Sequence, residues 1–120
     1  MDKNLKGLKP ALVWKHFAAI CEIPHPSHEE DAIRAYIVKW AEELGLEHKV
    51  DEAQNVYVYK PATPGMEDRK GIILQAHTDM VPQKNNDKEF NFSTDPIEAD
   101  VEGEGVTANG TTRGADNGSG

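Results

Sequence analysis

The sequence has few of the features that mark secreted, membrane-bound or nucleic-acid-binding proteins. Its single cysteine, Cys21, excludes an internal disulfide and is typical of a reducing compartment. No apolar run is long enough to cross a bilayer, and the polar residues 1–9 lack the apolar centre of a signal peptide. Only 13 Lys and Arg stand against 21 Asp and Glu, without a basic cluster. The net charge of −8 therefore disfavours nucleic acid and anionic membranes as partners, and we expect a cytoplasmic protein.

The first third of the sequence predicts two helices. At 120 residues, of which 38% are hydrophobic, the chain can form one globular domain at most. Apolar residues at helical spacing predict one helix that begins at Pro10 and ends at residues 23–24, where proline disfavours helical backbone. A second helix is predicted to end at Gly45. Ser27 and Glu30 have the spacing of a capping box for this second helix.

The remaining segments favour β-structure. Residues 46–50 and 55–60 predict two strands, and the alternating residues 97–108 predict a hairpin. The apolar run at residues 72–74 predicts a strand that is buried on both faces. We expect an α/β fold in which the two N-terminal helices pack on a mixed β-sheet.

Two chemically active side chains follow this predicted buried strand. His77 and Asp79 are two residues apart, so an extended backbone projects them to the same side. A histidine that can bind a metal, beside a carboxylate at the carboxyl end of a strand, indicates a reaction centre. Taken alone, such a histidine is more often buried and hydrogen-bonded in a core. His25 and His28 lie in a polar turn and are predicted to be solvated.

A glycine-rich stretch occupies residues 109–120. It does not have the glycine and lysine spacing of a phosphate-binding loop. It does place one carboxylate, Asp116, in the sequence Gly-Ala-Asp-Asn-Gly. Small neighbours let the backbone approach a metal or a second strand closely. The residues alone fit a flexible linker and a functional site equally well.

Together these motifs resemble one family of enzymes. The sequence His-Thr-Asp at residues 77–79, followed by the Asp116 motif, is similar to the dizinc clan that includes aminoacylases and carboxypeptidases. Residues 80–87 narrow the resemblance to the bacterial aminoacyl-histidine (Xaa-His) dipeptidases, and residues 21–27 match as well. By this resemblance, residues 1–120 are the incomplete N-terminal part of a zinc-peptidase catalytic domain, the first part of a dizinc exopeptidase.

The resemblance implies a role for each matching residue. His77 would ligate one zinc ion, Asp116 would bridge two zinc ions, and Asp79 would be the carboxylate that orients the site. It also implies hydrolysis of Xaa-His dipeptides such as carnosine by a water that the zinc ions activate, and cobalt or manganese would suit the same site. The family's general-base glutamate and further ligands have no counterpart here, so we expect the 120 residues alone to be inactive.

Two other functions stay open at this point. Another peptidase or aminoacylase of the same clan would carry the same residues, because its substrate selection depends on other parts of the protein. A non-catalytic α/β binding module would share the scaffold without depending on Asp79 and Asp116. The expected partner is a small dipeptide substrate, and the exposed edge of an incomplete sheet could also join copies into a homo-oligomer.

Overall fold

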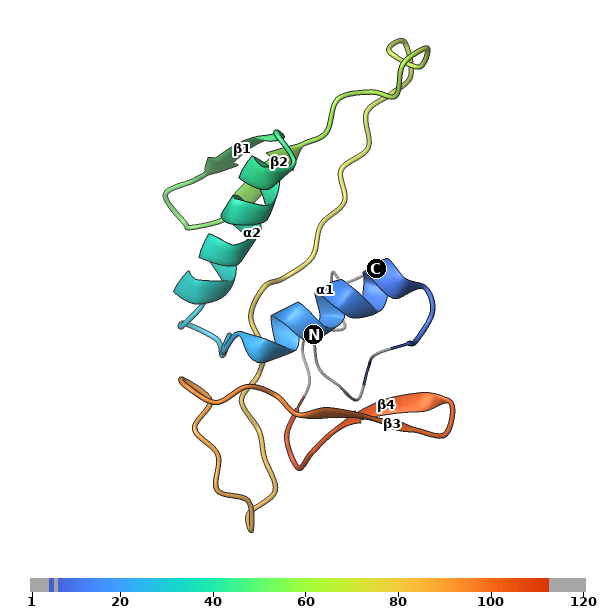
Figure 1. Ribbon diagram of the computed structural model, residues 1–120. Helices are drawn as coiled ribbons and strands as arrows, with labels where there is room; N and C mark the ends of the chain where they lie inside the picture. Colours follow the sequence, from blue (N-terminus) through green and yellow to red (C-terminus); the bar gives the residue numbers. More distant parts are fainter. Residues whose placement is uncertain (1–4, 6, 113–120) are drawn as a thin grey trace. The chain divides into compact units, whose positions relative to one another are not determined.

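The computed structural model describes residue 5 and residues 7–112. Contacts divide the chain into two compact units, one of Met1–Ile33 with Ala76–Gly120 and one of Arg34–Gln75. No helix in the described part of the chain is long and apolar enough to cross a membrane. The elements follow the order α1 (Ala11–Glu22), α2 (Asp31–Glu43), β1 (Glu47–Val50), β2 (Val56–Tyr59), β3 (Ala99–Glu102) and β4 (Gly105–Ala108) (Figure 1).

Both predicted helices and four of the predicted strands occur where the sequence places them, but the strands are arranged differently. β1 pairs with β2 and β3 pairs with β4, each pair antiparallel. The described strands therefore form two hairpins rather than one mixed sheet. The connections within both pairs are short, and a short connection joins antiparallel strands, whereas parallel strands need a crossover of a dozen or more residues.

The predicted buried strand at residues 72–74 is wrong for this structure. The exposed fractions of Ile72, Ile73 and Leu74 are 84%, 94% and 92%. An apolar run is buried on both faces only when neighbouring strands pair with it and other elements cover it. Among the described residues, the strands pair two by two and none is hydrogen-bonded to this run.

The unit that contains α1 is built around an apolar cluster. The helix begins at Ala11, one residue later than predicted, because Pro10 is extended with φ of −69° and ψ of 137°. Ile23 ends the helix, as predicted. Trp14 packs edge to face against Phe17, with 5.6 Å between the ring centroids. The Cys21 thiol is buried in this core, also as predicted. The buried members of the cluster are Leu5, Phe17, Ala18, Cys21, Met80, Ile97 and Ala99.

The other unit joins most of α2 to the β1–β2 hairpin. Gly45 has φ of +68°, a left-handed conformation that ends the helix and that glycine adopts without strain. The backbone N–H of Leu46 donates to the carbonyl of Ala41 at 2.9 Å. Arg34 Nε donates to the carbonyl of Gln54 at 2.9 Å, which ties the helix to the turn of the hairpin.

A carboxylate in that turn makes the hairpin sensitive to acid. Asp51 accepts hydrogen bonds from the Asn55 side chain at 3.1 Å, the Asn55 backbone N–H at 2.8 Å and the Tyr57 hydroxyl at 3.0 Å. These bonds, the Asn55 side chain first, lower the pKa of Asp51 below its usual value of 3.8. Since the folded-state pKa is the lower one, the stabilisation is present above the unfolded pKa and is lost as the pH falls through the folded pKa.

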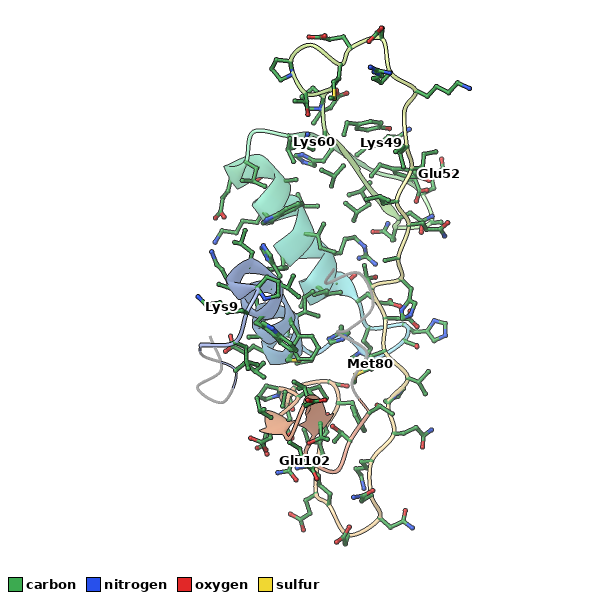
Figure 2. The ribbon with its side chains drawn as sticks, turned by 90° about the vertical axis from the view of Figure 1, so that its right-hand side faces the viewer. Lys9, Lys49, Glu52, Lys60, Met80 and Glu102 are labelled. Carbon is green, nitrogen blue, oxygen red and sulfur yellow. The ribbon has the colours of Figure 1, made fainter. Side chains whose placement is uncertain are left out.

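We therefore expect the hairpin to lose stability at pH values below the ordinary pKa of Asp51. NMR amide shifts of β1 and β2, followed from about pH 6 to about pH 2, measure this loss. The Asp51→Asn variant should lack this part of the acid dependence. Glu52→Gln, a change at the neighbouring residue (Figure 2), is the matched control and should keep it. Identical acid profiles for Asp51→Asn and the unchanged chain would contradict the prediction.

Candidate metal and catalytic site

The backbone next to Asp79 is held by the turn that follows α1. The N–H of Met80 donates to the carbonyl of His25 at 2.9 Å, and the N–H of Ser27 donates to the carbonyl of Met80 at 3.0 Å. Pro26 and Met80 thus form a parallel bridge, and Met80 (labelled in Figure 2) is buried in the apolar cluster. This bridge fixes the position at which the chain leaves Asp79.

His77 and Asp79 lie together, as the sequence predicts. His77 Nδ1 is 3.2 Å from Asp79 Oδ1 and 2.9 Å from the Asp79 backbone oxygen. The two side chains are 57% and 36% exposed, so His77 is not a buried core histidine. Both acceptors face the same ring nitrogen. A neutral ring that donates to them carries its proton on Nδ1 and its lone pair on Nε2, which is the arrangement that a metal ligand needs.

Asp79 has a second partner on its other oxygen. Ser27 Oγ donates to Asp79 Oδ2 at 2.6 Å. This bond is the largest cause of a lowered pKa for Asp79, and the charge of His77 lowers that pKa further, while burial opposes both. The carboxylate is therefore ionised at neutral pH and links the Ser27 hydroxyl to the His77 ring.

The predicted capping box is wrong. Ser27 lies outside the first turn of α2, its hydroxyl donates to Asp79, and the backbone N–H of His28 donates to Glu30 Oε1 at 3.1 Å. Donation to Asp79 uses the one hydroxyl proton and leaves the oxygen lone pairs of Ser27 available. The cap is absent because α2 begins only at Asp31, four residues after Ser27.

His25 also differs from its prediction, whereas His28 is exposed as predicted. The His25 side chain is 1% exposed, and its Nδ1 is 2.6 Å from the carbonyl of Ile23. Its Nε2 has no hydrogen-bond partner among the residues that the structure describes. The bridge to Met80 encloses this turn, and no local pattern in the sequence indicates that enclosure.

The described residues supply only part of a metal site. Within residues 5 and 7–112, no group of three or more His, Cys, Asp or Glu side chains could hold a metal ion. Imidazole and carboxylate are donors that suit zinc, and a zinc site takes three or four protein ligands. His77 and Asp79 fit such a site as one ligand and the carboxylate behind it. Asp116, the predicted bridging ligand, lies outside the described residues.

Two known proteins match nearly the whole chain, although no family model matches it. Cytosol non-specific dipeptidase of Escherichia coli (strain K12) is 53% identical over 117 residues, which are 98% of this chain and 24% of that protein. The chain is similar to the N-terminal part of a dipeptidase. The crystal structure of aminoacylhistidine dipeptidase from Vibrio alginolyticus matches 93% of the chain and 23% of that protein, with 54% identity and a TM-score of 0.90.

These matches confirm the resemblance that the motifs predict. They also confirm the α/β class, since the described helices and strands superpose on a fragment of a solved dipeptidase. The chain spans about a quarter of the length of both dipeptidases. The roles of His77, Asp79 and Asp116 stay predictions.

Proposed function

We propose that the protein containing this chain is a zinc-dependent dipeptidase that hydrolyses Xaa-His dipeptides such as carnosine. The observation that carries the proposal is the contact of His77 Nδ1 with Asp79 Oδ1, at 3.2 Å, in a chain 53% identical to a dipeptidase. One relative is named a non-specific dipeptidase and the other an aminoacylhistidine dipeptidase. Dipeptides are the substrate class common to both names, and the name of the Vibrio enzyme specifies histidine.

In this proposal the residues of the chain bind zinc and orient its ligands. His77 would hold zinc through Nε2, because Asp79 occupies its Nδ1. Asp79 keeps its charge at neutral pH and holds the ring in one orientation, as carboxylates behind metal-bound histidines do. Asp116 would bridge to a second ion. When bound, the metal supplies an activated water and polarises the peptide carbonyl, and cobalt or manganese would suit the same donors.

The same comparisons support proposals on the location and the domain of the whole protein. We propose a cytoplasmic enzyme, because the Escherichia coli relative is named a cytosol dipeptidase and the single cysteine of this chain excludes an internal disulfide. We further propose that residues 1–120 are the incomplete N-terminal part of its catalytic domain. The exposed run at residues 72–74 would then be covered by other parts of the protein or by a second copy in a homo-oligomer.

A hybrid enzyme tests the proposal. In this hybrid enzyme, residues 1–120 replace the matching segment of the Escherichia coli dipeptidase. We expect it to hydrolyse β-alanyl-histidine in the presence of zinc and to lose that activity when zinc is removed with a chelator. The isolated chain is the control and should show no hydrolysis, because residues 5 and 7–112 contain no group of three or more side chains that could hold zinc. A folded, zinc-supplied hybrid without peptidase activity would refute the proposed function.

A further inference from the structure

Ser27 is bonded to the candidate site although the resemblance assigns it no role there. Its Oγ lies 2.6 Å from Asp79 Oδ2, across a sequence separation of 52 residues. The hydroxyl donates to the carboxylate and not to His77. The three residue types of a serine-protease triad are therefore present, but Ser27 is not placed as a nucleophile with a histidine base.

The position of the Ser27 hydroxyl is set by the backbone on both sides of the contact. The N–H of Ser27 donates to the carbonyl of Met80, and the N–H of Met80 donates to the carbonyl of His25. Met80 is 3% exposed and belongs to the apolar cluster. Ser27 therefore reaches Asp79 from a fixed point next to the same short stretch of chain.

The carboxylate of Asp79 is held by different partners on its two oxygens. Oδ2 accepts from Ser27 Oγ, and Oδ1 faces His77 Nδ1 at 3.2 Å. The terminal torsion of an aspartate is otherwise broad, because it joins an sp³ to an sp² carbon. A partner on Oδ2 restricts that rotation and so fixes the direction of Oδ1.

We propose that Ser27 is a positioning residue: by holding Asp79 Oδ2 it aims Oδ1 at His77 Nδ1 and selects the ring tautomer with its proton on Nδ1. The consequence for metal binding through Nε2 rests on the proposed function, whereas the choice of tautomer does not. Replacing a partner behind a metal ligand typically weakens metal affinity about 10- to 100-fold. Ser27 acts one bond further away, so a tenfold weakening is the expected consequence.

NMR of the chain with labelled histidine tests the proposal directly. Ring ¹⁵N shifts distinguish the two neutral tautomers, and a His77→Gln variant assigns the His77 signal. We expect His77 to carry its proton mainly on Nδ1 in the unchanged chain and in Ser27→Thr, which keeps the hydroxyl. Ser27→Ala should shift the population toward the Nε2 tautomer that free histidine prefers. Ser93→Ala is the matched control, because Ser93 Oγ also donates to a carboxylate, that of Glu29 at 2.9 Å.

Each outcome decides the proposal. An unchanged tautomer in folded Ser27→Ala overturns it, and so does a His77 that carries its proton mainly on Nε2 in the unchanged chain, whatever the variants do. The second result needs no variant to fold. A tautomer that responds to Ser27 while the hybrid enzyme is inactive supports the role of Ser27 and rejects the proposed function. An active hybrid enzyme, together with a tautomer that does not respond to Ser27, supports the proposed function and rejects the role of Ser27.

Discussion

Replacing His77 by alanine in the hybrid enzyme is expected to abolish zinc-dependent hydrolysis of β-alanyl-histidine. Mutation of a residue that hydrogen-bonds to a metal ligand typically lowers activity by up to roughly 100-fold. The loss of activity should be larger here, because a ligand itself is removed. Zinc content should fall in parallel, since a site with one ligand fewer no longer has the three or four protein ligands that zinc takes. The measurements are kcat/KM at saturating zinc and the number of zinc ions bound per protein molecule.

His28→Asn is the matched control for this loss. His28 lies in the same unit as His77, and its side chain is exposed. Its φ is +71°, a conformation that asparagine tolerates better than alanine. The control should keep its zinc and its activity. Equal activities of His77→Ala and His28→Asn would remove His77 from the metal site.

Replacing Phe17 by alanine is expected to destabilise the unit that contains α1 by about 3–5 kcal/mol. Phe17 is 4% exposed and lies in the apolar cluster, where it contacts Trp14. Its removal leaves a cavity and discards the transfer free energy of a large ring. Since whole domains are stable by only about 5–15 kcal/mol, the open form of this unit should become strongly populated.

Cys21 reports this opening. Its side chain is 1% exposed and lies in the same cluster, so a thiol reagent reaches it when the unit opens. A loss of 3–5 kcal/mol should raise the labelling rate about 100-fold or more. Leu12→Ala, in the same helix but with Leu12 68% exposed, is the control and should change stability by no more than about 0.5 kcal/mol. Similar labelling rates for the two variants would show that Phe17 does not hold this core.

The elements that the sequence predicts correctly are those decided by neighbouring residues. Pro10 and residues 23–24 set the limits of α1 because proline restricts its own and the preceding backbone conformation. Gly45 and Gly103 have positive φ at a helix end and a hairpin turn. The contact of His77 with Asp79 is also local, because residues two apart in extended backbone share a side.

Other features depend on segments that are distant in the sequence. Ser27 has the spacing of a helix cap, yet its hydroxyl donates to a carboxylate 52 residues away. His25 lies in a polar turn, yet the bridge to Met80 buries it. Residues 72–74 have the composition of a buried strand, yet the described strands pair with one another and leave this run exposed.

One physical cause separates the features that the sequence predicts from those that it does not. Backbone conformation and the side on which a side chain emerges follow from steric and torsional preferences within a few residues, so they can be predicted from sequence. Burial, strand pairing and the partner of a hydroxyl depend on which surfaces meet in space, and local preferences do not determine that. The sequence therefore predicted that His77 and Asp79 lie together, whereas only the tertiary structure brought the Ser27 hydroxyl to Asp79.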